Sequence, residues 1–374
     1  MQNMVKYRHK FVIGDRKMSY KIKEINFHIT EFCEGHCPMC YATDDNMKRK
    51  HGDINTLKLI AHNAIKYGKV ERFVMVGGDP CEHPYLVDLI KFIKKEGKEY
   101  SIDTKTMVIS NTHDYKENGK SVDIEDVAKY IDGMCFTVHA DNAEEHDSFN
   151  GCPGSYEHAM NNLKKYAKLK NKKQEICIIV NLMPQTVNNF KKIMININKN
   201  LNSTVDGFAI QRIAPIGRAC GTEKYFIEQS DVNKVFEVCK EMKNEYGFFF
   251  EFVDAFPFCI LKKEYREMLP KGGCIWGKDY CAVFSDGTVS RCAMSENKLS
   301  KNVLELDTKE KFEKFWNTDK ELDSFRRKDY LDDKCKKCKL LEKCGGGCVL
   351  ARKTGDPYKK EKLEVGHDYL AKRM

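Results

Sequence analysis

Three closely spaced cysteines near the N-terminus are the residues that most directly imply chemistry. Cys33, Cys37 and Cys40 stand at C-x3-C-x2-C spacing. Iron–sulfur clusters are held by cysteine thiolates, usually four of them, and such spacing in one loop is typical of them. A loop that offers three thiolates to a four-iron cluster leaves one iron free to bind another molecule. The spacing therefore predicts a reactive cluster rather than a simple store of electrons.

Other interpretations of this loop stay open on spacing alone. Zinc takes four ligands, usually from Cys and His side chains, and His28 or His36 would supply the fourth. A disulfide pair or buried free thiols would also account for the loop. The N-terminus has no apolar block of a signal peptide, so we expect a cytoplasmic protein. In that compartment seventeen cysteines indicate metal or catalytic use rather than a disulfide framework.

Composition excludes several classes of protein. With 374 residues, 41% of them hydrophobic, the chain is long enough for two domains and a sizeable core. No run approaches the roughly 18 apolar residues of a membrane span. The net charge of +9 comes without a basic–aromatic motif and is typical of a solvated surface. We therefore expect neither a membrane nor a nucleic acid as a partner.

Alternating strand and helix patterns position the cysteine loop. Ile25, Phe27 and Ile29 alternate with polar residues and predict a strand that ends just before the loop. Five further strands are predicted, each followed by a helical pattern, at 73–76, 106–109, 134–138, 176–182 and 207–213. Six strand–helix units in succession imply a parallel sheet with right-handed crossovers. Because six units are too few for a closed eight-stranded barrel, we expect an α/β fold with a partial (β/α)6 barrel, whose strand ends are where barrel enzymes build active sites.

The predicted domains follow from this pattern. We expect a lead-in at 1–20, the barrel at 21–250 and a small cysteine-rich α+β domain at 251–374. A second candidate site segment, Gly77-Gly78-Asp79-Pro80, follows the second predicted strand. Two glycines there let the backbone approach a ligand closely or adopt a positive φ.

The cysteine loop and the Gly-Gly segment together resemble the radical S-adenosylmethionine (SAM) superfamily, whose members have a partial (β/α)6 barrel. In that family SAM chelates the free iron, and the reduced cluster cleaves it to a 5′-deoxyadenosyl radical that takes hydrogen from the substrate. The resemblance implies backbone contacts from Gly77 to Pro80 to the SAM amino group, with Asp79 in place of the usual glutamate. Met39 stands where the family commonly has an aromatic residue near adenine, and Tyr41 would take over part of that packing.

Further SAM contacts in this family come from later strand ends. By position, the resemblance assigns them here to Ser110, Asn111, His139, Asn181, Gln211 and Arg212. Arg218 lies in a Pro-Ile-Gly-Arg-Ala segment that resembles one common after the sixth strand. His146-Asp147 with Gly151 resembles another family segment, where we expect helix entry and loop capping. We expect Cys81 to be structural, and the sequence assigns no catalytic acid or base.

The C-terminal region holds a second group of cysteines. It comprises Cys274, Cys281, Cys292, Cys335, Cys338, Cys344 and Cys348. Residues 284–289, with a turn at 285–287, predict a hairpin between two of them. A zinc ribbon is the generic alternative for such a group.

This C-terminal pattern resembles the SPASM domain, an extension of radical SAM enzymes that holds two auxiliary four-iron clusters. The resemblance assigns an inner auxiliary cluster to Cys274, Cys281, Cys292 and Cys348, and an outer one to Cys335, Cys338 and Cys344. The family adds a last cysteine downstream, and none follows Cys348. The outer cluster would therefore use His367, Asp368 or another non-thiolate ligand, stay open at one iron, or be missing. Cys259 is an upstream cysteine whose placement does not match the family pattern.

SPASM-type enzymes mostly modify peptides or proteins. The resemblance implies an enzyme of peptide maturation that abstracts hydrogen from a ribosomally made precursor peptide or protein. It would install a thioether or carbon–carbon crosslink, a related oxidation or an epimer, with SAM and [4Fe–4S] clusters as cofactors. The expected partners are the precursor, an electron donor such as flavodoxin or ferredoxin, and a separate leader-binding protein where a leader is recognised.

Three rival functions stay open. Anaerobic sulfatase-maturing enzymes, which make formylglycine, have a similar cluster layout but carry an acid directly after the cysteine that matches Cys292. Ala293 occupies that position and weighs against this activity. Biosynthesis of a cofactor from a peptide is a second rival. A non-catalytic iron–sulfur electron carrier or zinc-binding scaffold is the third, and it predicts no SAM cleavage.

Overall fold

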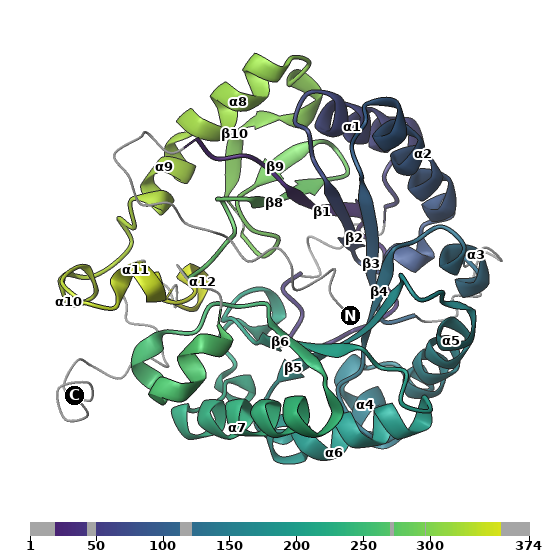
Figure 1. The fold of residues 1–374 in the computed structure, drawn as a ribbon, viewed down its shortest axis with the longest axis vertical. Coiled ribbons are helices and arrows are strands. Elements are labelled where there is room, and N and C mark those ends of the chain that lie inside the picture. The colour runs from purple at the N-terminus through teal and green to yellow at the C-terminus, as the bar shows by residue number, and fades with distance from the viewer. Residues whose placement is uncertain (1–18, 43–49, 113–121, 270–272, 296, 353–374) are drawn as a thin grey trace.

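The computed structural model describes residues 19–42, 50–112, 122–269, 273–295 and 297–352. Within these ranges the strands form one ten-stranded sheet in the order β10-β9-β8-β1-β2-β3-β4-β5-β6-β7 (Figure 1). The strands are β1 Glu24–Thr30, β2 Arg72–Gly77, β3 Lys105–Ser110, β4 Gly133–Thr137, β5 Glu175–Leu182, β6 Gly207–Arg212, β7 Phe249–Phe252, β8 Tyr280–Phe284, β9 Thr288–Ser290 and β10 Lys298–Asn302. The strands from β8 through β1 to β7 pair in parallel, whereas β9 pairs antiparallel with β8 and β10.

Helices connect the parallel strands and form a layer around the outside of the sheet (Figure 1). They are α1 Ile54–Lys66, α2 Leu86–Glu99, α3 Ile124–Ala128, α4 Ala143–Asn150, α5 Ser155–Leu169, α6 Pro184–Asn200, α7 Gln229–Tyr246, α8 Lys309–Thr318, α9 Lys320–Arg326, α10 Asp333–Lys336, α11 Leu341–Cys344 and α12 Val349–Arg352. The expected α/β fold with a parallel sheet and six strand–helix units is therefore confirmed. No helix in the described ranges combines the length and apolarity needed to cross a membrane.

Side-chain alternation divides the sheet into two faces. Ile25 and Phe27 of β1 point toward the helices and join the main core, where α1 contributes Leu57 and Ile60. A smaller apolar set occupies the opposite, inner face and consists of Val74, Met107, Cys135, Cys177, Ile179 and Ala209. The candidate site residues at the ends of the strands lie on the side of this inner face.

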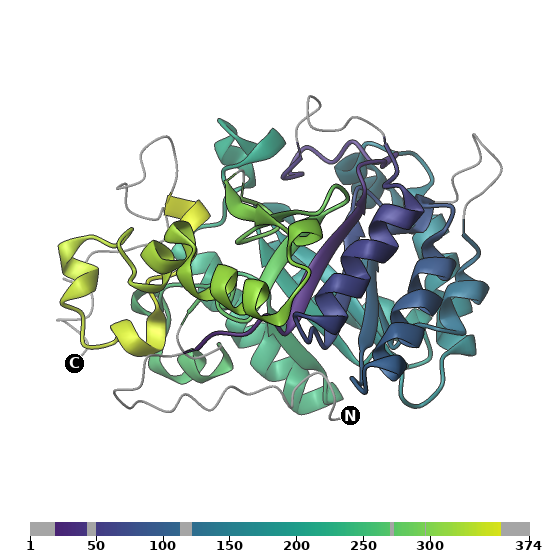
Figure 2. The ribbon, with the colours of Figure 1, turned by 90° about the horizontal axis from the view of Figure 1, so that it is seen from above.

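The C-terminal half contributes to the same sheet. β8 lies parallel to β1, with Cys281 opposite Ile25, and the predicted hairpin is the β8–β9 pair. The sheet thus continues past the expected boundary at 250, although the domain bounds themselves stay a prediction. Figure 2 shows the C-terminal helices on the flank of the molecule opposite the early helices.

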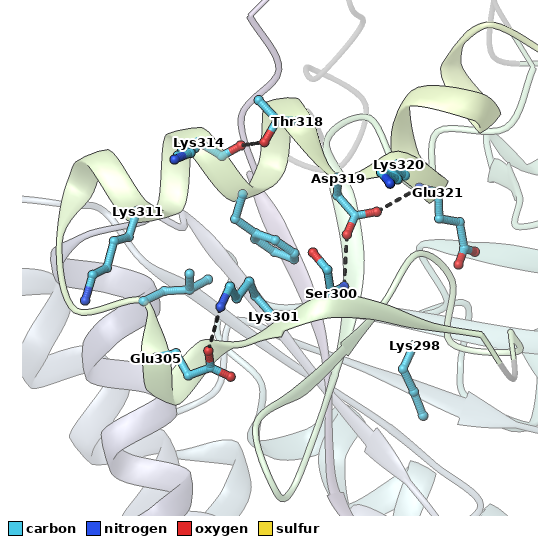
Figure 3. Close-up of a pocket in the computed structure, with 12 residues that line it drawn as sticks. Lys298, Ser300, Lys301, Glu305, Lys311, Lys314, Thr318, Asp319, Lys320 and Glu321 are labelled. Carbon is cyan, nitrogen blue, oxygen red and sulfur yellow. Dashed lines mark hydrogen bonds and ion pairs between the residues drawn. The ribbon is translucent and has the colours of Figure 1, made fainter.

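The β10 edge of the sheet is capped by a side chain. The Ser300 N–H, which points away from β9, donates to Asp319 Oδ2 at 2.9 Å (Figure 3). Asp319 also accepts from the Glu321 N–H at the start of α9. A carboxylate that occupies the edge blocks pairing with another strand. A groove of about 820 Å³ lies between β10 and α8, and Figure 3 shows the lysines on its rim, but no candidate cluster cysteine lines it.

Candidate active site

The cysteine loop leaves β1 at Thr30 and is held by backbone contacts from two other strand ends. The Gly78 N–H, just after β2, donates to the Thr30 carbonyl at 2.8 Å. The Arg218 N–H, in the turn that follows β6, donates to the Cys40 carbonyl at 2.9 Å. The fold therefore fixes both ends of the loop over the inner face of the sheet.

Two cysteine sulfurs and an amide converge around Gly35. A Cβ on this glycine would lie 3.5 and 3.6 Å from the Sγ atoms of Cys33 and Cys37, and 3.3 Å from Asn111 Nδ2. Burial raises the pKa of Cys33 well above its usual value and that of Cys37 to about 12. Such thiols become thiolates when a metal supplies the positive charge. The donor set fits an iron–sulfur cluster.

The histidines proposed as zinc ligands do not complete a mononuclear site. Among the described residues, no three His, Cys, Asp or Glu side chains converge as a single metal ion requires. His36 is exposed. His28 is buried, stacks on Phe284 at 4.5 Å between ring centroids and meets Tyr41 edge-on. Burial, with Lys298 as a smaller cause, lowers the pKa of His28 to about 3, so it is a neutral side chain on the inner face.

The two glycines after β2 are required by the approach of the cysteine loop. A Cβ on Gly77 would lie 2.1 Å from the Thr30 carbonyl oxygen, and Gly77 has φ of 142°. A Cβ on Gly78 would lie 1.9 Å from the Phe32 carbonyl oxygen. Any side chain here would push the loop away from β2. The predicted close approach exists, and its partner in this structure is the chain itself.

Asp79 binds other parts of the protein rather than open space. Its carboxylate accepts from the Ser110 hydroxyl at 2.6 and 2.9 Å, from the Cys81 N–H at 2.9 Å and from the Asn111 N–H at 3.0 Å. The carboxylate thereby ties the end of β2 to the end of β3. The Asp79 and Ser110 side chains bind each other, and the Gly78 and Asp79 N–H groups donate to the Thr30 and Phe32 carbonyls. Burial raises the pKa of Cys81 well above its usual value, which fits its expected structural role.

Three buried polar atoms at neighbouring strand ends lack a partner. Asn111 Oδ1, His139 Nδ1 and Asn181 Oδ1 make no hydrogen bond within the described residues. They follow β3, follow β4 and end β5 respectively. Because unpaired buried polar atoms are costly, each such atom indicates a missing partner. Burial, together with His146, lowers the pKa of His139 to about 3, so its ring is neutral. These atoms fit the polar groups of SAM.

Met39 and Tyr41 have different surroundings. Met39 packs in a small apolar cluster with Met183 and Tyr225. The Tyr41 hydroxyl donates to the Gly77 carbonyl at 3.2 Å. Tyr41 thus braces the Gly-Gly segment, while Met39 belongs to the packing beneath the loop.

Gln211 and Arg212 at the end of β6 face the C-terminal half. Gln211 Nε2 lies 3.9 Å from Met294 Sδ. The Arg212 N–H donates to Asp254 Oδ2 at 2.9 Å, and its guanidinium lies 5.3 Å from the Phe256 ring centroid. Burial raises the pKa of Asp254 to about 6 although Arg212 opposes that rise. These two residues join the barrel to the C-terminal region, and their assignment as SAM contacts stays a prediction.

The segment after β4 caps a helix, as expected. Asp147 accepts from the Gly154 and Tyr156 N–H groups and from the Ser155 hydroxyl at the start of α5. His146 Nδ1 accepts from the His139 N–H at 3.2 Å. The sequence carries no signal for Asn150, whose side chain contacts Cys37 Sγ at 3.4 Å.

Three of the C-terminal cysteines gather beside the barrel. Cys292, after β9, and Cys348, before α12, share an apolar cluster with Ala214. Burial raises the pKa of Cys292 to about 12 against the opposing charge of Arg291, and the Cys274 and Cys348 thiolates add to the rise. Mutual electrostatic influence places Cys274, Cys292 and Cys348 in one neighbourhood.

Tyr41 connects this neighbourhood to the first loop. Burial raises the pKa of Tyr41, and the thiolates of Cys40, Cys33 and Cys292 raise it further. Cysteines of both sets therefore lie close enough to the Tyr41 hydroxyl to influence its pKa. The β8–β1 pairing brings the two sets together although Cys40 and Cys292 are 252 residues apart in the sequence.

Cys281 lies in a different environment. It is fully buried on β8 in the main core, with Val283 on the same face of the strand. Burial raises the pKa of Cys281, and the next cause is Glu24 rather than another thiolate. The structure therefore does not bring Cys281 together with the other three thiols of the expected inner set. Its assignment as a ligand stays a prediction that this placement disfavours.

The expected outer set lies around α10 and α11. Asp332 caps the turn by accepting from the Cys335 N–H at 2.8 Å, and the Cys338 sulfur accepts from the Leu340 N–H at 3.4 Å. The Cys344 sulfur accepts from the Phe258 N–H at 3.2 Å. Cys259, which did not match the family pattern, is thus one residue from a contact with Cys344. The other proposed ligands, His367 and Asp368, lie outside the described residues.

Two family models match this chain. Residues 27–195 match the radical SAM superfamily, and residues 274–339 match the iron–sulfur cluster-binding domain called SPASM. The two segments contain the cysteine loop and most of the C-terminal cysteines. The chain is a radical SAM enzyme with a C-terminal SPASM domain, and its cofactors are SAM and [4Fe–4S] clusters.

Individual relatives are distant but extend over most of the chain. The AdoMet-dependent heme synthases of Nitratidesulfovibrio vulgaris and Oleidesulfovibrio alaskensis are 22% and 21% identical, over 87% and 86% of this chain and 86% and 81% of the relatives. Streptococcus suis SuiB bound to precursor peptide SuiA has a TM-score of 0.69 at 17% identity, covering 91% of this chain and 75% of SuiB. The structure of anSMEcpe with AdoMet, another abbreviation for SAM, and the Cp18Cys peptide has a TM-score of 0.65 at 16% identity, covering 93% of both chains. These structural likenesses establish the fold.

Proposed function

We propose that this enzyme abstracts hydrogen from a ribosomally made peptide or protein in the cytoplasm and that the product is a crosslink, a related oxidation or an epimer. The observation that carries the proposal is the proximity of the two cysteine sets, which the β8–β1 pairing brings together and which both influence Tyr41. A substrate radical formed in the barrel would lie near a cluster that can accept its electron. The peptide-bound states of SuiB and anSMEcpe, which share this fold, support a peptide as the substrate.

The chain's own residues have definite tasks in such a reaction. When bound, the first cluster and SAM supply one-electron cleavage of the sulfonium and a 5′-deoxyadenosyl radical. Asn111, His139 and Asn181 offer buried, unpaired polar atoms to hold SAM. The backbone at Gly77 and Gly78 fixes the cysteine loop, and the apolar residues of the inner face would limit the access of water to the reacting atoms. Flavodoxin or ferredoxin is the proposed electron donor, and a separate protein the proposed reader of any leader.

The test of radical chemistry is anaerobic reconstitution followed by assay under dithionite. We expect bound iron and sulfide, and 5′-deoxyadenosine detected by liquid chromatography. Cys33→Ala, Cys37→Ala and Cys40→Ala should each reduce 5′-deoxyadenosine to background, because the cluster that binds SAM is lost. Cys220→Ala is the matched control, since Cys220 is exposed and belongs to neither cysteine set. Bound zinc, or wild-type protein that cleaves no SAM, would remove the proposal.

The substrate class needs a separate assay. Co-expression with short peptides encoded beside the enzyme should yield a peptide that has lost two hydrogens per crosslink, or an epimer detected by deuterium uptake. A tetrapyrrole is the second candidate, favoured by two heme-synthase relatives that align over most of this chain. Conversion of a tetrapyrrole towards heme by the reconstituted enzyme, with every peptide unchanged, would favour that candidate. Formylglycine on a sulfatase peptide would favour the sulfatase-maturing activity, against which Ala293 weighs.

A further inference from the structure

A buried arginine lies against the candidate inner auxiliary cluster. Arg291 directly precedes Cys292 and is only 4% exposed. An arginine keeps its positive charge in proteins. Burying such a charge is unfavourable unless an opposite charge lies nearby. Arg291 therefore needs a negatively charged neighbour within the fold.

That counter-charge is not a carboxylate. Arg291 forms no salt bridge with Asp or Glu within the described part of the chain. Burial lowers the pKa of Arg291, but the thiolates of Cys274, Cys292 and Cys348 outweigh it and raise the pKa, with Glu321 as the smallest contributor. The same three thiols form the candidate inner set. Because Arg291 is buried directly before Cys292 and pairs with no carboxylate in the described ranges, we take the negative charge of these thiols, and of any cluster they hold, as its counter-charge.

The packing holds the arginine in this position. Its guanidinium carbon lies 4.3 Å from the centroid of the Phe325 ring. A Cβ on Gly277 would lie 2.6 Å from Arg291 Cγ, so the aliphatic stem needs a glycine at that position. An aromatic platform and a glycine that admits the stem leave the side chain little freedom to turn away.

Other basic residues near the inner set are influenced electrostatically by fewer of its thiols. Lys278 is influenced by Cys274 and by no other thiol among its main causes. Arg212 acts on Cys348, and its backbone N–H also binds Asp254. Only Arg291, among the described residues with a resolved shift, has all three thiols among its causes.

We propose that Arg291 is the built-in counter-ion of the inner auxiliary cluster and sets its reduction potential. Reduction adds one electron, and hence one negative charge, to the cluster. A fixed positive charge stabilises the reduced form more than the oxidised form, and cluster potentials follow net charge and burial. The inner cluster is thereby made a better acceptor for the electron that a substrate radical releases. The electron-accepting role rests on the proposed function, whereas the effect of Arg291 on the cluster potential does not depend on which substrate the enzyme takes.

The experiment is a dithionite titration of reconstituted full-length protein, followed by electron paramagnetic resonance. It uses a background in which Cys33, Cys37 and Cys40 are alanine, so that the signal comes from auxiliary clusters. We expect Arg291→Met to move the inner-cluster midpoint to more negative potential at unchanged iron content. Arg291→Lys, which keeps the charge, should stay near the unsubstituted midpoint. An unshifted midpoint in Arg291→Met with full iron content would overturn the proposal.

A matched control separates charge from packing. Arg326 is also an arginine stacked on aromatic rings in this region, at 4.0 Å from the Tyr20 centroid and 5.1 Å from that of Trp316. No thiolate is among the causes of its pKa shift. Arg326→Met should therefore leave the midpoint unchanged, and an equal shift in this variant would overturn the proposal. If Arg291→Met fails to retain iron, retention in Arg291→Lys supports a role of charge, whereas equal loss in both variants contradicts it.

Discussion

Two kinds of cysteine share the C-terminal sequence pattern, and burial geometry separates them. Cys292 lies after a strand, next to other thiols and a buried arginine. Cys281 lies within a strand, and its side chain joins the apolar layer beneath the helices. A thiol in such a layer behaves as a small hydrophobic side chain. The inner cluster of this enzyme is thus expected to have three cysteine ligands from this chain, with Cys281 as packing.

Replacement of these two cysteines tests that expectation. Cys281→Val keeps a small apolar β-forming side chain in the core and should cost less than about 1.5 kcal/mol of stability. Its iron content should equal that of the unsubstituted protein. Cys292→Ala should lose about four iron atoms per chain, because it removes one of only three cysteine ligands of the inner cluster. Iron and sulfide analysis after anaerobic reconstitution measures both, and loss of iron in Cys281→Val would restore the four-cysteine set.

At the scale of single residues, the sequence identifies chemistry better than orientation. Spacing predicts the thiols of both sets, and position at strand ends, through the family resemblance, predicts Asn111, His139 and Asn181; their roles as ligands stay predictions. Spacing does not reveal which face of a strand a residue occupies when both faces are buried, as they are on β8. Nothing in the sequence distinguishes Arg291, because one basic residue beside a cysteine resembles any surface charge until its burial is known.

The elements of the barrel meet at glycines, and this contact has an energetic consequence. Gly217 lies in the turn after β6 with φ of 56°, and a Cβ there would lie 2.2 Å from the Tyr41 carbonyl oxygen. The turn and the cysteine loop are therefore in backbone contact. Gly221, with φ of 76°, has nothing within 4 Å of the same position. The two glycines share a left-handed backbone but differ in their neighbours.

Alanine at each of these glycines separates strain from contact. Gly221→Ala should cost about 1–2 kcal/mol, the penalty of a left-handed backbone for a residue with a side chain. Gly217→Ala carries the same penalty and also displaces the cysteine loop. Because small misplacements cost large factors in rate, 5′-deoxyadenosine formation should fall about tenfold or more in Gly217→Ala alone. Denaturant unfolding and the cleavage assay measure the two effects, and equal cleavage in both variants would contradict the argument.

At the scale of elements, local patterns predicted most of what the structure contains. The six expected strands and the 284–289 hairpin are present within the described residues. β7, Phe249–Phe252, was not predicted, since four residues with three phenylalanines show no clear alternation. The sequence does not predict the pairing of β8 with β1 either, because it joins positions about 256 apart and no local pattern encodes such a contact.

That long-range pairing makes the two halves of the molecule one sheet. An ion pair crosses it on the inner face: Arg72 of β2 binds Glu24 of β1, and Arg72 Nη2 donates to the Tyr280 hydroxyl of β8 at 3.2 Å. Glu24 is 6% exposed. Burial raises the pKa of Glu24 against the opposing charge of Arg72, so the carboxylate depends on its partner.

Removal of one partner should therefore loosen the junction between the halves. Arg72→Met leaves Glu24 buried without its cation and should lower the free energy of unfolding by about 3–5 kcal/mol. Combining it with Glu24→Met removes the uncompensated charge, and the double variant should recover most of that loss, because apolar pairs often replace buried ion pairs at little cost. Urea unfolding of the anaerobic holoprotein measures both. A double variant as unstable as Arg72→Met would mean that Arg72 acts through Tyr280 and its packing, and not through the charge of Glu24.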